Sequence, residues 1–150
     1  MKTSVLMVCL GNICRSPLAE GILKNKVNPE KIFVDSAGTA GYHVGNKPDI
    51  RSIAIAKKNG IDISKQSCRK FSKNDFKDFD LIYVMDKSNY KNIISLTNKV
   101  EEINKVKLLL DEITIDIKEV PDPYYDTDKG FKIVFDLINT ACNTIAEKLT

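Results

Sequence analysis

Apolar and polar residues alternate along this chain in blocks that predict strands and helices in turn. Four short apolar runs have the length and composition of β-strands. They cover residues 3–8, 31–35, 81–85 and 106–109. Between and after these runs, apolar residues recur at the spacing of a helix. The predicted helices cover residues 17–27, 50–59, 73–78, 87–97 and 129–148.

The same spacing predicts which helical positions face the core. They are Ala19, Ile22, Leu23 and Val27 in the first helix, Tyr90, Ile93 and Ile94 in helix 87–97, and Phe131, Val134, Phe135, Ile138, Cys142, Ile145 and Leu149 at the end of the chain. Gly60 is expected to end the helix that starts at Ile50, and Ser72 is expected to cap the short helix 73–78. Residues 37–49 contain three glycines and one proline and form a predicted loop.

Strands that alternate with helices are typical of a parallel sheet with helices on both faces. The sequence therefore predicts an α/β fold with a four-stranded, parallel, twisted sheet. A chain of 150 residues suits a single domain, residues 1–150, and is long enough to bury a sizeable core. Parallel sheets of this kind bind ligands beyond the carboxyl ends of their strands.

Charge and hydropathy limit the classes of partner. The chain carries 23 basic and 20 acidic residues, and its net charge of +3 is too small for the footprint of a nucleic-acid-binding protein. No apolar run approaches the length of a membrane span, and the run near the start is too short for the core of a signal peptide. We therefore expect a cytoplasmic protein with neither a nucleic acid nor a membrane as partner.

The content of cysteine and histidine argues against a metal centre. The four cysteines lack paired C-x-x-C spacing, which disfavours both a disulfide scaffold and a zinc site. The single histidine excludes a histidine-rich metal site. The sequence therefore predicts no metal and no cofactor.

Residues 9–17 carry the most informative motif: a cysteine, five residues, an arginine, a serine and a proline, directly after an apolar strand. A tight loop between a strand and a helix can form a phosphate-binding nest of backbone N–H groups, to which the helix N-terminus adds partial positive charge. Arg15 can bind two phosphate oxygens at once with its planar guanidinium. Cys9 would lie at the floor of this cradle, where the ionised sulfur is favoured as a nucleophile.

The other loop residues fit the same interpretation. Gly11 supplies permissive backbone angles, Asn12 tolerates left-handed geometry, and Ser16 can donate its O–H to the sulfur. Pro17 suits the first position of a helix. The competing interpretation is that Cys9 is an ordinary buried cysteine at the end of a core strand.

The motif at residues 8–17 resembles the signature loop of low-molecular-weight protein tyrosine phosphatases. Further matches to that family are spread along essentially the whole chain. They lie at residues 35–39, 41–43, 48–51, 85–89 and 122–125. The resemblance implies a cysteine-dependent phosphoric monoester hydrolase that acts on phosphotyrosine in proteins or peptides and also binds phosphate or vanadate.

The resemblance also assigns roles to residues. It implies that Cys9, Arg15 and Asp122 are catalytic, with a phosphocysteine intermediate on Cys9 and with Asp122 as general acid and then base. By spacing alone, Asp122 would be read as part of a turn, although Pro123 holds it extended. Residues expected to bind the substrate are Leu10, Gly11, Asn12, Ile13, Cys14, Ser16, Tyr42, Tyr124 and Tyr125. His43 is expected at the rim rather than as a base.

One departure from the family pattern concerns the bracing of the signature loop. Many members carry a histidine shortly after the second helix, and we place Lys65 at that position. A protonated lysine cannot accept a hydrogen bond, so we expect different bracing of the loop. Cys14, across the loop from Cys9, is a possible partner for a disulfide under oxidation; simple packing beneath the loop is an equal alternative.

Three other functions remain open from the sequence. Protein-arginine phosphatases resemble this chain but carry threonine where Ile13 stands and lack the tyrosine pair. Arsenate reductases use two further cysteines, and Cys68 has no cysteine close after it. A non-catalytic phosphate-binding module would not need both a nucleophile and an acid.

Overall fold

The computed structural model describes residues 2–124 and 127–150 and confirms the α/β fold. Its four strands are all parallel and lie in the order β2-β1-β3-β4. They are β1 Thr3–Cys9, β2 Ile32–Gly38, β3 Leu81–Val84 and β4 Val106–Leu108. The chain passes from β1 to β2 on one edge of β1 and later crosses to β3 on the other edge. The carboxyl end of β1 is therefore a topological switch point.

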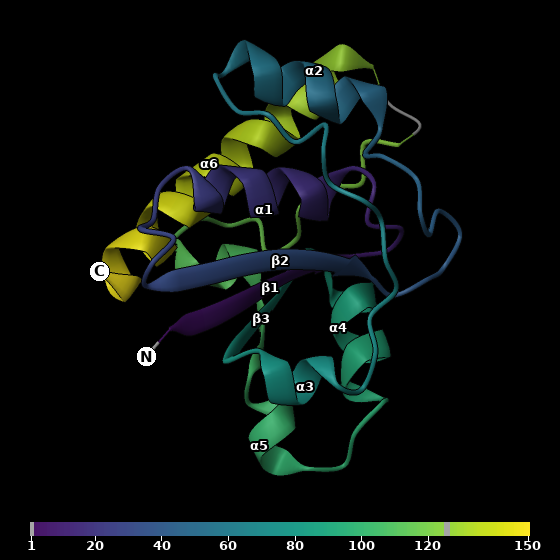
Figure 1. Cartoon of the computed structure of the whole chain (residues 1–150), viewed down its shortest axis with the longest axis vertical. Helices are drawn as coiled ribbons and strands as arrows, with labels where there is room; N and C mark the ends of the chain where they lie inside the picture. The colour runs from purple at the N-terminus through teal and green to yellow at the C-terminus, as the bar shows by residue number, and fades with distance from the viewer. Residues whose placement is uncertain (1, 125–126) are drawn as a thin grey trace.

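Helices cover both faces of the sheet, as Figure 1 shows. The long helix α6 Asp128–Leu149, α1 Arg15–Lys24 and α2 Ile50–Lys58 lie on one side. The short helices α3 Asp75–Asp78 and α5 Val100–Ile103, together with α4 Lys87–Ile94, lie on the other. A 3-10 helix, η1 Leu109–Glu112, follows β4. Within the described residues, no helix is long and apolar enough to cross a membrane.

The alternation of side chains along β1 divides the core in two. Val5 and Met7 point toward the cluster formed with α1 and α6, whereas Leu6 and Val8 join the cluster around Phe76 on the opposite face. From Val5 to Cys9 the strand is apolar at every position, because both of its faces are buried there. This explains the continuous apolar run near the start of the sequence.

Helix α1 differs from its prediction at both ends. It begins at Arg15, two residues before Pro17, and it ends at Lys24 rather than residue 27. Pro17 is therefore the third helical residue, a position whose N–H lacks a partner within the helix in any case. Val27 follows the helix and still packs against the larger cluster.

Two other helices are shorter than predicted, one at its start and the other at its end. The short helix predicted at 73–78 is α3, which starts at Asp75, and Ser72 does not cap it; instead the Ser72 N–H donates to the Asp75 carboxylate at 2.9 Å. Helix α4 ends at Ile94 rather than residue 97. Its start is fixed by a capping box between Asp86 and Asn89, which satisfies backbone N–H groups at the helix N-terminus. The sequence analysis did not predict α5 or η1.

Gly38, the last residue of β2, packs directly against the loop that follows β1. A Cβ at this position would lie 2.8 Å from the Leu10 carbonyl oxygen and 3.0 Å from the Asn12 nitrogen. These neighbours are backbone atoms, which cannot move aside as the end of a flexible side chain can. The loop after β1 therefore depends on the absence of a side chain on β2.

We expect Gly38→Ala to lower the free energy of unfolding by about 1–3 kcal/mol, the usual cost of overpacking a close contact. Urea denaturation gives the measurement. Gly41→Ala is the matched control, because a Cβ there meets only side-chain atoms at 3.6 Å and 3.7 Å. Equal stability of the two variants would contradict the close packing of β2 on the loop.

Candidate active site

A cavity of about 300 Å³ opens at the carboxyl end of β1 and contains most of the predicted site residues. Its lining is Cys9, Leu10, Gly11, Ile13, Cys14, Arg15, Tyr42, His43, Asp122 and Tyr124. Asn12 and Ser16 are buried beneath the loop and bind Cys9 rather than lining the cavity. Tyr125 lies outside the described residues.

Cys9 is the last residue of β1, and its thiol is held by two polar neighbours. The sulfur lies 3.0 Å from the Ser16 hydroxyl and accepts a hydrogen bond from the Asn12 backbone N–H at 3.3 Å. Cys9 is almost fully buried but borders the cavity. These two contacts fix the position of the sulfur at the edge of the cavity, where it can meet a bound molecule.

Arg15 is 2% exposed, and the protein around it supplies acceptors for its guanidinium. One terminal nitrogen donates to the Asp86 carboxylate at 2.7 Å and to the Val120 carbonyl at 2.9 Å. Burial tends to lower the pKa of Arg15, but the neighbouring Cys9 sulfur and the Asp86 carboxylate outweigh it and raise the pKa. The guanidinium therefore stays charged beside the thiol.

Asp122 lies on the other side of the same guanidinium. One of its carboxylate oxygens is 3.6 Å from the second terminal nitrogen of Arg15, and the other accepts the Tyr124 N–H at 3.1 Å. The loop that carries Asp122 is tied to β3, because the Val120 N–H donates to the Met85 carbonyl at 2.8 Å. Asp122 is 42% exposed, so a proton can pass between its carboxyl group and a molecule in the cavity.

Aromatic residues surround the entrance of the cavity. Tyr42 and Tyr124 both line it, with Tyr42 76% exposed to solvent. His43 stands between them, with ring centroids 6.4 Å from Tyr42 and 6.1 Å from Tyr124. His43 is thus a rim residue, as expected, and Ile13 adds apolar surface.

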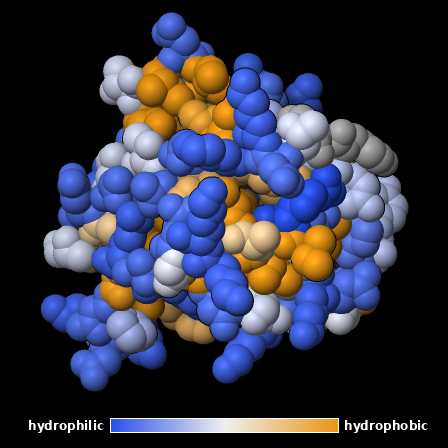
Figure 2. Space-filling model, turned by 90° about the horizontal axis from the view of Figure 1, so that it is seen from above, coloured by the Kyte–Doolittle hydropathy of each residue, from blue (hydrophilic) through white to orange (hydrophobic). Residues whose placement is uncertain are grey.

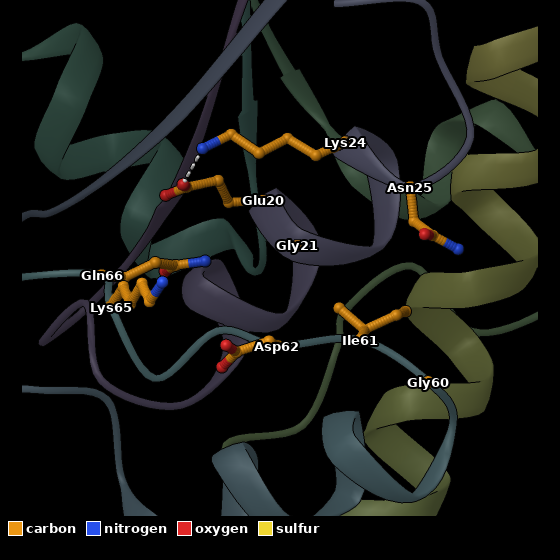
Figure 3. Close-up of a pocket in the computed structure, with 9 residues that line it drawn as sticks. All are labelled: Glu20, Gly21, Lys24, Asn25, Gly60, Ile61, Asp62, Lys65 and Gln66. Atoms are coloured by element: carbon orange, nitrogen blue, oxygen red, sulfur yellow. Dashed lines mark hydrogen bonds and ion pairs between the residues drawn. The ribbon is translucent and has the colours of Figure 1, made fainter.

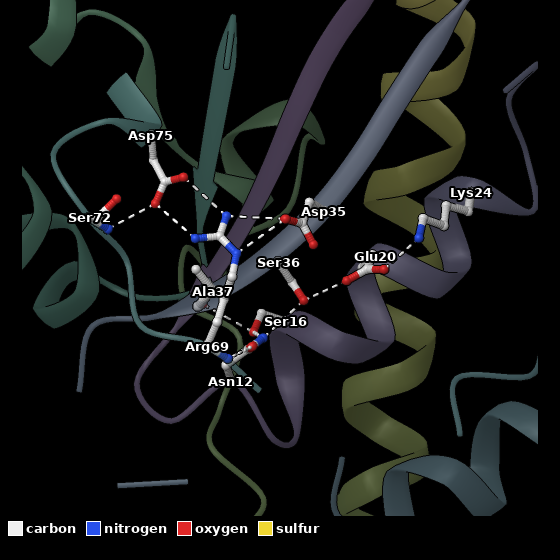
Figure 4. A network of polar contacts seen from close by, with 10 residues as sticks. All are labelled: Asn12, Ser16, Glu20, Lys24, Asp35, Ser36, Ala37, Arg69, Ser72 and Asp75. Carbon is white, nitrogen blue, oxygen red and sulfur yellow. Dashed lines mark hydrogen bonds and ion pairs between the residues drawn. The ribbon is translucent and has the colours of Figure 1, made fainter. Parts of the chain in front are cut away.

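Beneath the loop, a chain of buried polar groups connects Asn12 to Glu20 (Figure 4). The Asn12 side-chain amide donates to the hydroxyls of Ser16 at 2.8 Å and Ser36 at 2.9 Å. The Ser36 hydroxyl donates to Glu20 at 2.6 Å, and the second Glu20 oxygen accepts from Lys24 at 2.6 Å. This network fixes the loop from below and leaves the cavity side free.

The segment after α2 also braces the loop, although Lys65 takes no part. The Arg69 backbone N–H donates to the Asn12 side-chain oxygen at 3.0 Å, and the Cys68 thiol donates to the Asn12 carbonyl at 2.8 Å. Gln66 donates to the Pro17 carbonyl at 3.1 Å, whereas Lys65 is exposed. The bracing from this segment comes from the residues after Lys65.

The remaining thiols lie in surroundings that keep them protonated. Burial raises the pKa of Cys14, with the Asp49 and Cys9 charges acting in the same direction. Burial also raises the pKa of Cys68 to about 11 and that of Cys142 to about 12. These thiols are therefore poor nucleophiles at neutral pH.

A second cavity, of about 520 Å³, lies between α1 and residues 60–66 and is shown in Figure 3. Glu20, Lys24 and Gln66 are among its lining residues, and it contains none of Cys9, Arg15 or Asp122. Within the described residues, no group of three or more His, Cys, Asp or Glu side chains is arranged to hold a metal ion.

Asp86 is the functional residue that the sequence analysis missed. It sits at the end of β3, within a segment noted only as a family match, and it binds Arg15 while capping α4. The available signal was its position: an acidic residue at the carboxyl end of the strand adjacent to β1. In a parallel sheet such a residue faces the same edge as the loop after β1.

Comparisons with known proteins identify a family for this chain. The family model for low molecular weight phosphotyrosine protein phosphatase matches residues 4–150. The enzyme of that name from Schizosaccharomyces pombe is 45% identical over 85% of this chain and 84% of its own.

Two solved structures have the same fold. A protein tyrosine phosphatase from Entamoeba histolytica, with Hepes in its active site, is 38% identical, with a TM-score of 0.93 over 99% of this chain and 97% of its own. Wzb from Vibrio vulnificus, in complex with benzylphosphonate, is 30% identical, with a TM-score of 0.88 over 99% of this chain and 100% of its own. With the family model matching nearly its whole length, the chain belongs to the low-molecular-weight phosphotyrosine protein phosphatases, a family of phosphoric monoester hydrolases.

Proposed function

We propose that residues 1–150 form one phosphatase domain that hydrolyses phosphotyrosine in proteins or peptides through a phosphocysteine on Cys9. The observation that carries this proposal is the arrangement around Arg15. Its buried guanidinium borders the same cavity as the Cys9 sulfur and has Asp122 beside one of its terminal nitrogens. A nucleophile, a cation for phosphate and an acid thus border one cavity.

In the first step, the Cys9 thiolate attacks phosphorus while the bond from phosphorus to the tyrosine oxygen breaks. Asp122 enters this step protonated and gives its proton to the departing oxygen. Arg15 and the loop N–H groups bind the non-bridging oxygens, where charge develops in the transition state. The Ser16 hydroxyl, 3.0 Å from the sulfur, stabilises the thiolate before attack.

In the second step, water attacks the phosphocysteine and the bond from phosphorus to sulfur breaks. The Asp122 carboxylate now accepts a proton from that water, and phosphate leaves the restored thiolate. Charge stabilisation in both steps comes from Arg15 and the loop, so the reaction needs neither a metal nor an organic cofactor. Phosphate and vanadate are expected to occupy the same cradle.

The aromatic entrance supports an aryl substrate. Tyr42 and Tyr124 can flank a substrate ring, and such aromatic pairs contribute about 0.5–1.5 kcal/mol beyond the burial of area. The relative that was solved with benzylphosphonate binds an aryl group joined to a phosphorus acid, the same pairing of groups. The apolar Ile13 side chain offers no hydrogen bond to a guanidinium, which favours phosphotyrosine over phosphoarginine.

The central test is Cys9→Ser, which we expect to abolish turnover of p-nitrophenyl phosphate and of phosphotyrosine while inorganic phosphate still binds. The serine hydroxyl is a far weaker nucleophile, whereas Arg15 and the loop backbone remain. Turnover with a chelator present and phosphate binding by calorimetry give the measurements. Cys142→Ser, a buried cysteine in α6, is the matched control and should stay active. Substantial activity of Cys9→Ser would exclude it as nucleophile.

Arg15→Lys should be nearly as inactive as Arg15→Ala, with kcat/KM reduced on the order of 10²–10³-fold. The reason is geometric. One terminal nitrogen of the guanidinium donates to Asp86 and Val120, and the other lies near Asp122. A lysine has a single ammonium nitrogen, which cannot occupy both positions. Steady-state kinetics on an aryl phosphate measure the effect. A lysine variant that retains most of the wild-type kcat/KM would show that charge alone suffices.

Asp122→Asn should reduce the rate by about 10²–10⁴-fold for phosphotyrosine and by much less for phosphates of acidic phenols, which need little protonation on leaving. The asparagine oxygen can still accept the Tyr124 N–H, so the loop should keep its geometry. A series of aryl phosphates measures this dependence, with the exposed Asp116→Asn in the same loop as control. An equal loss across the series would rule out Asp122 as the acid.

A further inference from the structure

A groove of about 510 Å³ lies between α2 and the start of α6, outside the catalytic cavity. Its lining is Ile50, Arg51, Ala54, Ile55, Lys58, Asp128, Lys129, Phe131 and Lys132. Figure 2 looks down on the side of the molecule where α2 lies in Figure 1 and shows apolar surface there, interrupted and bordered by hydrophilic side chains. The reaction proposed above uses none of these residues.

The groove begins where the wall of the catalytic cavity ends. Arg51 lines the groove, and it donates to the backbone carbonyl of Tyr124, a cavity residue, at 2.7 Å. The Arg51 guanidinium lies 4.5 Å from the centre of the Phe131 ring and is held from its other side by Asp49 at 3.0 Å. A chain that leaves the catalytic cavity over Tyr124 therefore meets Arg51 and the groove next.

The α2 side of the groove carries apolar side chains that are open to solvent. Ile50 is 79% exposed, and Ala54, one turn further along α2, is exposed as well. An exposed aliphatic surface next to a binding cavity gains free energy when an apolar side chain covers it. The groove can thus accept one apolar side chain on this part of α2.

The rim of the groove is basic. Arg51, Lys58, Lys129 and Lys132 border it, against the single carboxylate of Asp128. Arg51 is paired with Asp49, and Lys132 with Asp136 at 3.0 Å. Lys58 and Lys129 are exposed and make no ion pair with the described part of the chain. The groove therefore offers positive charge on both α2 and α6, which complements an acidic ligand.

We propose that this groove binds the segment next to the phosphotyrosine of an acidic protein substrate, with an apolar side chain against Ile50 and Ala54 and carboxylates against Lys58 and Lys129. This inference rests on the proposed function, since phosphotyrosine must occupy the catalytic cavity for its neighbours to reach the groove. The groove acts on recognition alone and should change KM with little effect on kcat.

Binding to the Cys9→Ser protein tests the proposal directly. The probes are three phosphotyrosine peptides. Two of them carry one leucine and two glutamates, one before the phosphotyrosine and the other after it. In the third, neutral peptide, alanine replaces the leucine and glutamine replaces the glutamates. Lys58→Glu/Lys129→Glu should weaken binding of the better acidic peptide by roughly 2- to 30-fold, the range expected for two exposed ion pairs. Lys31→Glu/Lys73→Glu, which changes the net charge equally at exposed positions outside the groove, should leave binding unchanged.

A second matched pair of variants tests the apolar side chains on the α2 side of the groove. Ile50→Ser should weaken binding of the leucine-containing peptide, whereas Ile133→Ser, an exposed isoleucine on α6 outside the groove, should not. In enzymes that retain Cys9, the same variants should raise KM for the acidic peptide and leave kcat and the hydrolysis of p-nitrophenyl phosphate unchanged.

Three results would overturn the groove proposal. The acidic peptides could bind no better than the neutral one, both charge-reversal variants could weaken binding equally, or sedimentation could show a second copy of the chain on the groove. In each of these cases p-nitrophenyl phosphate would still be hydrolysed. A wild-type protein that fails to hydrolyse both this ester and phosphotyrosine would instead overturn the proposed function, and the groove proposal with it.

Discussion

The site depends on one strained but fully bonded residue, Asn12. Its backbone has a φ of 57°, in the left-handed region that non-glycine residues seldom occupy. Its backbone N–H and carbonyl bind Cys9 and Cys68, and its side chain donates to Ser16 and Ser36. The side-chain oxygen accepts the N–H of Arg69. A glycine could adopt this backbone and keep its two backbone bonds, but it would lose the side-chain bonds to Ser16 in α1, Ser36 in β2 and Arg69.

The second constraint is the cost of burying the guanidinium of Arg15. A buried charge without partners is strongly unfavourable, and here Asp86, the Val120 carbonyl and the Cys9 sulfur offset that cost. These partners come from the end of β3, the loop before α6 and the end of β1. Because the chain brings three distant segments to one charge, the fold and the anion-binding site stabilise each other.

The sequence was sufficient for the architecture, and most of the site residues that it singled out line one cavity, although their roles stay predictions. The apolar runs predicted four strands near their observed positions, because the central strands β1 and β3 are buried over most of their length and therefore read as nearly continuous apolar runs. Helix ends were less accurate, since they follow tertiary bonds: α4 is fixed by the capping box of Asp86, and Ser72 donates to Asp75 instead of capping. Asp86 was missed because its partner, Arg15, is 71 residues away in the chain.

The structure separates reaction chemistry from recognition. Cys9, Arg15 and Asn12 are buried and held by short hydrogen bonds, so a substitution near them disturbs several elements at once. The entrance and the groove are different: Tyr42 at the entrance and Ile50 in the groove are largely exposed and carry little of the packing. Changes there cost little stability, since substitutions on the surface usually have small effects. In this chain, substitutions at the entrance and along α2 can therefore alter recognition of a substrate without disturbing the buried residues around Cys9.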